Sequence, residues 1–496
     1  MKYNIRLRIA LAFLAVLMLL GTVACGNTNN NTAQTTPAAS VTEEADERKA
    51  NDPHVAAQDW GGDNFTILYN GYTLEPNLDF IAEEANGAPL NDAVYKRNMA
   101  IQEKHSLVIN PVYAKDADFA NTLQKDQKSG ECDISLVETC LNYTMQLAID
   151  GFFTELGYLP GINFDKPYWY KNLLEGSSIG GKNYFFYSDS CIHAFGATPC
   201  TIFNKTIHEN LGYADLYQMV KDKNWTYEEM SKMVKTTYAQ SGENTTGKMD
   251  IKKDTIGLVA NTFCIDCFFS GSGFQMITKD EDDMPVLNVL NDTYYSIMES
   301  ITALCAEENN MYLCDRYGSG EQVRDIDPKE AMEQNRALFW IGNFKCVERL
   351  RAMPTDFGVL PIPMANKEQK DYKVHMQVSV GASMAVPQYC PDPEAVSDIL
   401  EDIAYQSYLY VMPAYMDVLI MGQVARDLPS LESIKIILGS YYCDLGYMLN
   451  RKGIDLIDQM HTMVKDNKAP NGVLKSVETV YNNNLTRIKA SIAELD

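Results

Sequence analysis

The side chains that could carry chemistry in this chain are numerous, but their spacing does not predict a catalytic centre. The 496 residues include 12 Cys, 6 His and 66 Asp and Glu. The histidines stand at positions 54, 105, 193, 208, 375 and 461, without the short spacings of metal ligands. Neither HExxH nor GxxxxGK[ST] occurs, so zinc-protease and P-loop chemistry have no support. The sequence therefore predicts no catalytic residues, no metal site and no cofactor.

Cysteine spacing leaves two interpretations of the thiols. Residues 264–267 form a CxxC, but no second CxxC or nearby histidine pair completes a zinc site. Two other close pairs, Cys191 with Cys200 and Cys305 with Cys314, could form disulfides in an exported protein. Free and mostly buried thiols are the alternative.

The charge balance restricts the possible partners. The formal net charge is −24, and phosphate contacts need clusters of Lys and Arg, so nucleic acid is not expected as a partner. A strongly acidic protein binds a neutral or cationic small molecule more easily than an anionic one. Two carboxylates could still act as the acid and base of a glycosidase, although 66 Asp and Glu make a close pair expected by chance.

The first 24 residues predict export. Three basic residues precede an apolar run, residues 9–20, which is too short to cross a membrane and has the length of a signal-peptide core. Ala24 directly precedes Cys25. This end resembles the lipobox of bacterial lipoproteins. The resemblance implies that residues 1–24 are removed and that Cys25 carries the lipid, including palmitate. An ordinary secretory signal is the alternative.

The residues after the signal predict a flexible tether. Residues 25–58 are rich in Asn, Thr, Ala and charged side chains, which bury too little apolar surface to offset the entropy of ordering. Folded sequence begins near Trp60. The roughly 435 residues that remain exceed the size at which a single core stops growing, so two lobes are expected. We expect a monomer on the outer face of the cell membrane, held there by its N-terminal lipid alone.

The folded part alternates between β-rich and helical patterns, as is typical of parallel α/β sheets. Predicted strands are residues 64–70, 107–112, 133–137, 256–260, 337–341 and 357–360, and predicted helices are 90–105, 117–128, 328–335 and 344–353. Thr226 and Glu229 have the spacing of a capping box, so Trp225 before them is interpreted as structural. Asp327 and Asn343 are predicted to cap the helices that follow them. Residues 270–273, Ser-Gly-Ser-Gly, predict a flexible turn.

Several segments, in this order, resemble the sugar-type extracellular solute-binding proteins of bacterial ABC importers, the family that includes maltose-binding protein. They are NFTILYNGY, TIFNKTIHENLGY with WTYEEM, ALFWIGNF, DFGVLPIPM, VGASMAVP and SYYCDLGYMLN. The resemblance implies a type II periplasmic-binding-protein-like α/β fold. Each of two lobes would be a mixed or parallel sheet flanked by helices, and crossing hinge strands would join the lobes. Residues 59–191 and 386–430 would form lobe one. Residues 192–385 and 431–496 would form lobe two and the hinges, with crossings near 192–197 and 378–385.

Candidate ligand contacts in lobe one follow from the strand ends, because ligands of open α/β sheets bind beyond the carboxyl ends of strands. The candidates are Tyr69, Asn70, Tyr72, Glu138 and Thr139. Amide, hydroxyl and carboxylate groups suit a polyol, and tyrosine adds a flat face. Trp169, in an aromatic loop, could line a pocket rim or plug the surface of the lobe.

Candidate contacts in lobe two are Phe263, Asp266, Asn343, Phe344 and Tyr442. Phe263 could stack on a sugar or pack in the core. Asn343 and Phe344 end the segment LFWIGNF, where the resembling family sets an aromatic side chain, usually Trp, against its ligand. Leu338 and Ile341 of the same segment are expected in the core.

The sequence thus predicts a lipid-anchored receptor for carbohydrate transport. It would capture a small solute, a sugar or an oligosaccharide, between its lobes and deliver it to the permease subunits of an ABC transporter. Two alternatives are a surface lipoprotein glycosidase and a sensor or adhesion lipoprotein that works without a permease.

Overall fold

The structure is a computed structural model that describes residues 46–70, 79–130, 132–245, 249–306, 311–315, 327–420 and 428–495. The chain divides into two units, Met1–Ala50 and Asn51–Asp496, and the second contains both main sheets. Cys25, the signal residues 1–24 and Tyr72 lie outside the described residues, as does most of the tether. Among the helices that are described, none is long and apolar enough to cross a membrane.

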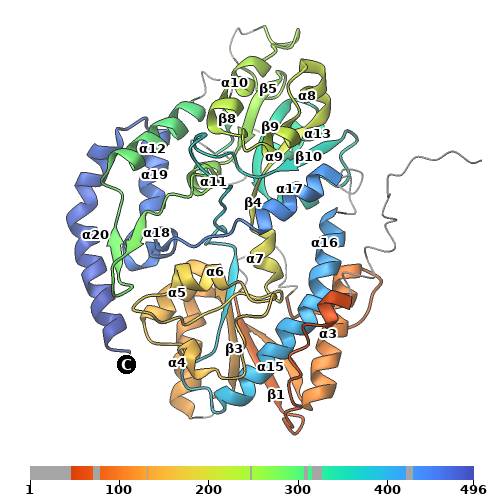
Figure 1. Ribbon diagram of the computed structural model, residues 1–496, viewed down its shortest axis with the longest axis vertical. Helices are drawn as coiled ribbons and strands as arrows, with labels where there is room; N and C mark the ends of the chain where they lie inside the picture. Colours follow the sequence, from red (N-terminus) through yellow and green to blue (C-terminus); the bar gives the residue numbers. More distant parts are fainter. Residues whose placement is uncertain are drawn as a thin grey trace, which may run out of the picture. The chain divides into compact units, whose positions relative to one another are not determined.

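The first sheet has four strands in the order β11-β3-β1-β2. Strands β1 (Asn64–Tyr69), β2 (Val108–Tyr113) and β3 (Ile134–Cys140) are parallel, and β11 (Ala382–Ala385) is antiparallel to β3. Figure 1 shows this sheet between α3 (Pro89–His105) and α15 (Pro393–Gln406) on one side and α4 (Asp116–Ser129) and α5 (Leu141–Ile149) on the other. The predicted strand and helix alternation at this end of the chain is confirmed.

The second sheet is mixed, with five strands in the order β10-β4-β9-β5-β8. The strands are β4 (Pro199–Asn204), β5 (Ile256–Ala260), β8 (Met311–Leu313), β9 (Ala337–Asn343) and β10 (Phe357–Leu360). Strand β9 is parallel to β5 and antiparallel to β4. Its residues Leu338 and Ile341 are buried, as predicted.

The helices around the second sheet are mostly short. They are α8 (Lys205–Leu211), α9 (Leu216–Lys221), α10 (Tyr227–Thr237), α11 (Phe263–Gly271), α13 (Pro328–Glu333), α14 (Phe344–Arg349) and α17 (Leu428–Leu438). The prediction of a flexible turn at residues 270–273 is wrong for Ser270 and Gly271. Both end α11, whose apolar side chains continue the helical pattern to that point.

The remaining elements lie beside these two layers. They are α6 (Lys171–Ser177), α12 (Asp292–Leu304), α16 (Met412–Ile420), α18 (Leu445–Met448), α19 (Leu456–Lys465), α20 (Pro470–Ala493) and the hairpin of β6 (Ile277–Lys279) and β7 (Pro285–Leu287). Figure 1 shows α12, α19 and α20 side by side, and contacts between them join the C-terminal helices into one layer.

Two links between the sheets lie at the predicted crossings, but their form differs from the expectation. The link at 192–197 is not a strand, because Ile192–Gly196 forms the short helix α7. The carboxylate of Asp79 accepts a hydrogen bond from the His193 N–H at 3.0 Å and so caps this turn. At the other crossing, β11 already belongs to the first sheet by Ala382, so the link itself is the irregular stretch 374–381.

Capping residues that the sequence singled out begin three helices. The side chains of Thr226, Asp327 and Asn343 accept hydrogen bonds from backbone N–H groups at the starts of α10, α13 and α14. Trp225 is fully buried, and its Nε1 donates to the carbonyl of Pro361 at 3.0 Å. Its structural interpretation is therefore confirmed.

The disulfide pairs that the sequence left open do not form. No disulfide joins any of the cysteines in the described ranges. Cys191, Cys200, Cys305 and Cys314 are all buried in the core, as are both cysteines of the CxxC at 264–267. The alternative of mostly buried thiols is the one that the structure supports.

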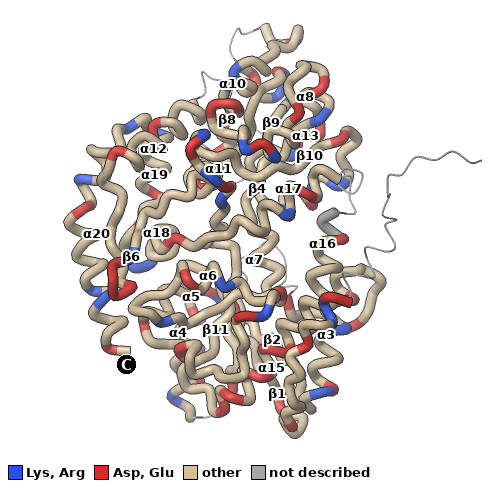
Figure 2. Tube along the Cα trace, viewed as in Figure 1, with Lys and Arg blue, Asp and Glu red and all other residues tan. Residues whose placement is uncertain are grey.

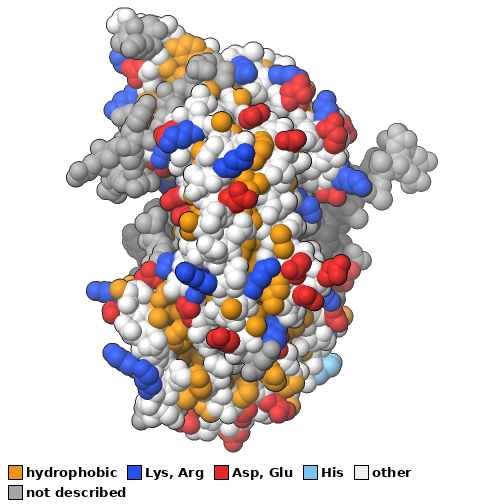
Figure 3. Space-filling model, turned by 90° about the vertical axis from the view of Figure 1, so that its left-hand side faces the viewer, with side chains coloured by type: hydrophobic (Ala, Val, Ile, Leu, Met, Phe, Trp, Pro, Cys, Tyr) orange, Lys and Arg blue, Asp and Glu red, His pale blue; other side chains and the backbone are white. Residues whose placement is uncertain are grey.

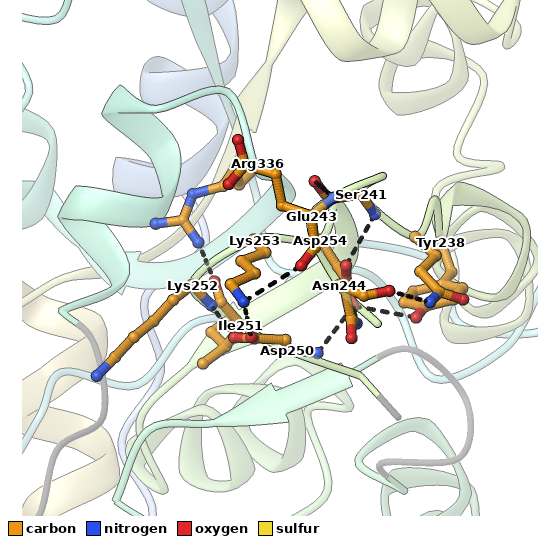
Figure 4. A network of polar contacts seen from close by, with 11 residues as sticks. Tyr238, Ser241, Glu243, Asn244, Asp250, Ile251, Lys252, Lys253, Asp254 and Arg336 are labelled. Carbon is orange, nitrogen blue, oxygen red and sulfur yellow. Dashed lines mark hydrogen bonds and ion pairs between the residues drawn. The ribbon is translucent and has the colours of Figure 1, made fainter. Parts of the chain in front are cut away.

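A buried carboxylate organises the loop between α10 and β5. Asp254 accepts hydrogen bonds from the Tyr238 hydroxyl at 3.0 Å, the Asn244 amide at 2.7 Å and the backbone N–H groups of Ser241 and Asp250 at 2.9 and 2.8 Å (Figure 4). Burial raises the pKa of Asp254, but the hydrogen bonds together lower it by more than burial raises it. The net pKa therefore lies below the ordinary value. One side chain thus satisfies four donors.

Removal of this carboxylate should be costly. We expect Asp254→Ala to lower the free energy of unfolding by about 3 kcal/mol, because buried donors lose a charged acceptor. Asp254→Asn keeps one acceptor oxygen and should lose less. Urea unfolding measures both, and equal losses for the two variants would contradict the role assigned to the charge.

Charged side chains are spread over the described surface. Figure 2 shows Asp and Glu on helices beside both sheets. On the face formed by α20, Figure 3 shows Lys and Arg interspersed with Asp and Glu rather than gathered in one patch. This distribution fits the acidic composition and gives no basic surface on that face.

Candidate functional site

A cavity of about 590 Å³ lies where elements of both sheets meet the link at 374–381. Asn142 contributes from α5, which packs on the first sheet, and Pro199 of β4 and residues of α11, which packs on the second sheet, contribute from the other side. The remaining walls are residues 375–379, Asp315, Tyr447, Asn450, Asp455, Ile457, Asp458, His461 and Lys465. Cavities of 300 to 1,000 Å³ are typical of small-molecule sites.

The link at 374–381 is fixed to both sheets by its backbone. Its carbonyls at Val378 and Gly381 accept from the N–H groups of Asn142 at 3.2 Å and Leu141 at 3.0 Å. These are the first N–H groups of α5, which otherwise have no partner inside the helix. The N–H of Gln377 donates to the carbonyl of Ala197 at 3.4 Å, next to the other link. The link that lines the cavity is therefore hydrogen-bonded to the segments just after β3 and just before β4.

The start of α11 is held by a carboxylate from the neighbouring strand. Oδ1 of Asp315, just after β8, accepts from both the N–H and the hydroxyl of Thr262, each at 2.6 Å. Phe263 follows and is half-buried in the cavity wall. The carboxyl end of the second sheet thus positions an aromatic side chain and a carboxylate side by side.

An ion pair joins α11 to α19 across the cavity wall. Nε2 of His461 lies 2.9 Å from Oδ1 of Asp266. Burial lowers the pKa of His461, but attraction by Asp266, the hydrogen bond to it and the charge of Asp458 outweigh burial, so the net pKa is raised. The Tyr447 hydroxyl donates to the backbone carbonyl of Asp266 at 3.2 Å. Asp266 is therefore held in place from two helices.

The cavity is richer in acceptors than in cations. Asp266, Asp315, Asp455 and Asp458 line it, against Lys465 and His461. Burial and the neighbouring carboxyl of Asp458 raise the pKa of Asp455. Burial lowers the pKa of His375 to about 4, so this ring is neutral at pH 7. Carboxylates of this kind can accept from hydroxyl or ammonium groups of a solute.

The helix α18 that carries Tyr447 begins at a fully buried carboxylate. Asp444 accepts from the N–H groups of Gly446 at 2.9 Å and Met276 at 2.7 Å. Burial nevertheless raises its pKa to about 6. A carboxyl whose pKa is higher in the folded state stabilises the fold fully below its unfolded pKa, and that contribution is lost as the pH rises through the folded pKa.

This shift predicts a pH-dependent difference between the wild type and Asp444→Asn. The unfolded pKa is 3.8 and the folded value about 6, a difference of about 2 that corresponds to about 3 kcal/mol. The stability of the wild type relative to the variant should therefore fall by about that amount between pH 4 and pH 7. Urea unfolding across this range checks it, with the exposed Glu83→Gln as control. A difference independent of pH would contradict the shift.

The structure places the lobe-two candidates at three depths. Phe263 and Asp266 line the cavity. Asn343 and Tyr442 lie behind its wall, where their side chains donate to the Gln377 side chain at 3.5 Å and the Ser270 carbonyl at 3.2 Å. Phe344 is fully buried at the start of α14, so it packs in the core rather than facing the cavity.

The structure brings four lobe-one candidates together at the carboxyl ends of β1 and β3. Tyr69 lies opposite Glu138 in the sheet, followed by Asn70 and Thr139. Burial and the Glu138 charge raise the pKa of Tyr69. Asn70 is nearly buried, and neither atom of its side-chain amide has a hydrogen-bond partner. This group does not include residues that line the cavity, but Asn142 follows Thr139 by three residues and does.

Trp169 belongs to the core of the first sheet. Its Nε1 donates to Glu401 of α15 at 2.8 Å, and its ring meets that of Phe186 edge-on at 5.4 Å. Trp169 is buried and does not line the cavity, so the structure does not support the interpretation as a pocket rim.

Several lining residues were not predicted from the sequence. One group is Asp458, His461 and Lys465, which share one face of α19. Their spacing of three and four residues, opposite the apolar Met460 and Met463, is a signal of one polar helix face. Tyr447 lines the cavity instead of the candidate Tyr442.

A serine in a segment with the letters of a nucleophile elbow is not placed as a nucleophile. Residues 176–180 read GSSIG, the letters of a GxSxG elbow. Ser178, however, follows the end of α6, where its hydroxyl donates to the Glu175 carbonyl at 3.0 Å and accepts from Lys279 at 2.5 Å. Nor does any group of three or more His, Cys, Asp or Glu side chains within the described ranges form a metal site.

Comparisons with known proteins identify the fold. No protein-family model matches the chain, and no curated protein does. Solved structures match along 81 to 87% of this chain and nearly all of theirs. The cyclic α-maltosyl-1,6-maltose binding protein from Arthrobacter globiformis matches with a TM-score of 0.54 and 13% identity, covering 86% of this chain and 99% of its own.

Two further structures extend the comparison. The ABC substrate-binding protein Lmo0181 from Listeria monocytogenes, in complex with cycloalternan, has a TM-score of 0.51 and 12% identity over 87% of this chain and 99% of its own. UgpB from Mycobacterium tuberculosis, in complex with glycerophosphocholine, has a TM-score of 0.52 and 13% identity over 81% of this chain and 97% of its own. The chain therefore has the periplasmic-binding-protein-like fold of the ABC substrate-binding proteins, as its segments predicted.

Proposed function

We propose that this protein is the solute-binding receptor of an ABC importer and that it binds a sugar or an oligosaccharide without transforming it. The cavity beside α11 carries this proposal, because it is lined from both sheets and from a link between them. The solved structures of the same fold that bind cyclic oligosaccharides support the choice of ligand class.

The site offers the groups that a sugar needs. Phe263 presents a half-buried ring for the apolar face of a sugar, and Asp266 and Asp315 present carboxylate oxygens for its hydroxyls. The candidates Tyr69, Asn70, Glu138 and Thr139 would contact the solute from the first sheet, and Tyr72 is proposed as a further contact. The unpartnered amide of Asn70 supports a polar contact there.

The permease would recognise the solute-bound protein because the two lobes close around the solute. A solute that contacts both sheets favours the arrangement in which both sets of contacts are made, and this shifts the population toward it. Delivery to permease subunits and anchoring through a lipid on Cys25 complete the proposal. A monomer suffices for both.

A thermal-shift panel tests the function. Purified protein is heated with one solute at a time at about 1 mM, because a ligand that binds the folded state raises the melting temperature. The solutes are glucose, maltose, maltotriose, cellobiose, a cyclic oligosaccharide, glycerophosphocholine and spermidine. We expect at least one sugar to raise the melting temperature and to be recovered unchanged. Recovery of shorter sugars would instead support the glycosidase. No shift with any sugar would contradict a sugar receptor.

A sensor or adhesion lipoprotein remains the second candidate, because the same cavity could bind a solute without a permease. Radiolabelled uptake in cells that carry or lack the gene separates the two. Uptake that is independent of the gene, with binding intact, would favour the sensor.

A further inference from the structure

A second cavity, of about 660 Å³, lies beside the amino ends of β1 and β3, away from the strand ends that face the proposed solute. Backbone and side chains of Asn64, Thr66, Asp133 and Ser135 line it, and so do two cysteines, Cys132 and Cys390. Nothing in the solute-binding proposal uses these thiols.

The sheet brings the two cysteines to the same place. Strands β3 and β11 are antiparallel neighbours, with Cys140 opposite Ala382 and Val137 opposite Ala385. Cys132 comes just before β3, and Cys390 comes just after β11, in a turn where its N–H donates to the Pro387 carbonyl at 3.1 Å. In two antiparallel neighbours, the start of one strand lies beside the end of the other. The segment before β3 and the segment after β11 therefore lie at the same end of the sheet.

Both cysteines line this one cavity, and each has a thiol pKa above its ordinary value. Burial is the main cause that raises the pKa of Cys390, to about 11, and the thiol of Cys132 adds to it. The pKa of Cys132 is also raised, by burial and by Asp126 and Asp133. Both thiols are therefore largely protonated at pH 7 and react slowly there.

Accessibility distinguishes this pair from the other described cysteines. Cys132, Cys346 and Cys390 are partly exposed, and the remaining eight are buried. Cys346 lies in a different part of the fold, packed against Gly342 of β9. The open cavity gives a small reagent a route to Cys132 and Cys390 together.

We propose that Cys132 and Cys390 are an oxidisable pair that closes into an intramolecular disulfide on reaction with a small-molecule disulfide. The thiolate of one cysteine attacks the reagent, forms a mixed disulfide and releases one reagent thiolate. The other cysteine, as its thiolate, then attacks the protein sulfur of that mixed disulfide and releases the second. Two protein thiols are oxidised, one reagent disulfide is reduced to two thiols, and the atoms balance.

The disulfide would join two segments beside the first sheet that are far apart in the sequence. It would join the start of β3 to the turn that leads into α15, whose cap is Asp392. The loop it closes includes all five strands of the second sheet, and long closed loops restrict the unfolded chain most. We expect the oxidised protein to melt a few °C higher than the reduced protein, by roughly the shift of a typical disulfide in a chain of this size.

Mass spectrometry of the full chain tests the proposal. Protein reduced under argon is incubated with oxidised glutathione at pH 8.5, quenched with N-ethylmaleimide and digested. We expect a cross-linked peptide pair that joins Cys132 to Cys390, and the loss of two thiols. We also expect an increase in melting temperature that dithiothreitol reverses. Because both thiol pKa values are raised, the thiolate fraction and with it the reaction rate should increase steadily from pH 7 to pH 9.

Variants make the assignment specific. Cys346→Ser, the matched control, should form the same cross-link and show the same melting shift. Cys132→Ser and Cys390→Ser should each lose the shift and accumulate one glutathione adduct on the remaining cysteine. Stable glutathione adducts on both cysteines of the wild type, or failure of either to react, would overturn the proposal. The wild-type spectrum decides this even if a variant does not fold.

Discussion

Asp266→Asn is expected to weaken binding of the most stabilising sugar of the thermal-shift panel by roughly 10- to 100-fold. A hydrogen bond to a charged group contributes about 1.5 to 3 kcal/mol, and about 1.4 kcal/mol is a factor of ten in affinity. Asp266 lines the cavity, and its carboxylate is held by His461 at 2.9 Å. Asparagine keeps the size of the side chain but removes its charge.

The substitution also reports on His461. Asp266 raises the pKa of His461, so the variant should titrate this histidine at a lower pH, which NMR of the ring protons can follow. Asp282→Asn, on an exposed loop, is the matched control and should leave affinity unchanged. Wild-type affinity in Asp266→Asn, measured by calorimetry, would remove Asp266 from the proposed contacts.

Trp225→Ala is expected to lower the free energy of unfolding by about 3 to 5 kcal/mol, the largest stability effect that we predict. The ring is fully buried and packs on Phe339 at a centroid distance of 5.5 Å. Its loss leaves a cavity in the second sheet and deprives the Pro361 carbonyl of a donor.

A conservative variant separates the two contributions. Trp225→Phe keeps most of the packing and loses the hydrogen bond, so it should cost about 1 to 2 kcal/mol. Urea unfolding gives both values, and sugar affinity of the folded fraction should be unchanged in each. A cost of less than about 1 kcal/mol for Trp225→Ala would contradict its place in the core.

The features that the sequence predicted are those set by neighbouring residues. The first three strands, the helices between them and the caps at Thr226, Asp327 and Asn343 depend on local patterns and lie where expected. Helical caps need only a side chain and the next few N–H groups. The short helix α7 was missed, because its capping carboxylate, Asp79, is more than a hundred residues away.

The site was only partly predictable for the same reason. Phe263 and Asp266 were candidates because they come soon after a strand, and the structure places both in the cavity wall. The polar face of α19 meets α11 only after nearly two hundred residues of chain, as the pair Asp266 and His461 shows. The four-residue helix α18 is too short for a periodicity that could favour Tyr447 over Tyr442. Trp169 likewise packs on Glu401, whose position no local pattern reveals.

A crystal structure of the protein with the most stabilising sugar of the panel tests the central claim most directly. The account predicts the sugar in the 590 Å³ cavity, with its apolar face on Phe263 and a hydroxyl within hydrogen-bond distance of Asp266. Contacts from the first sheet, beginning at Asn142, should complete the site. A sugar bound elsewhere, with this cavity unchanged, would contradict the account.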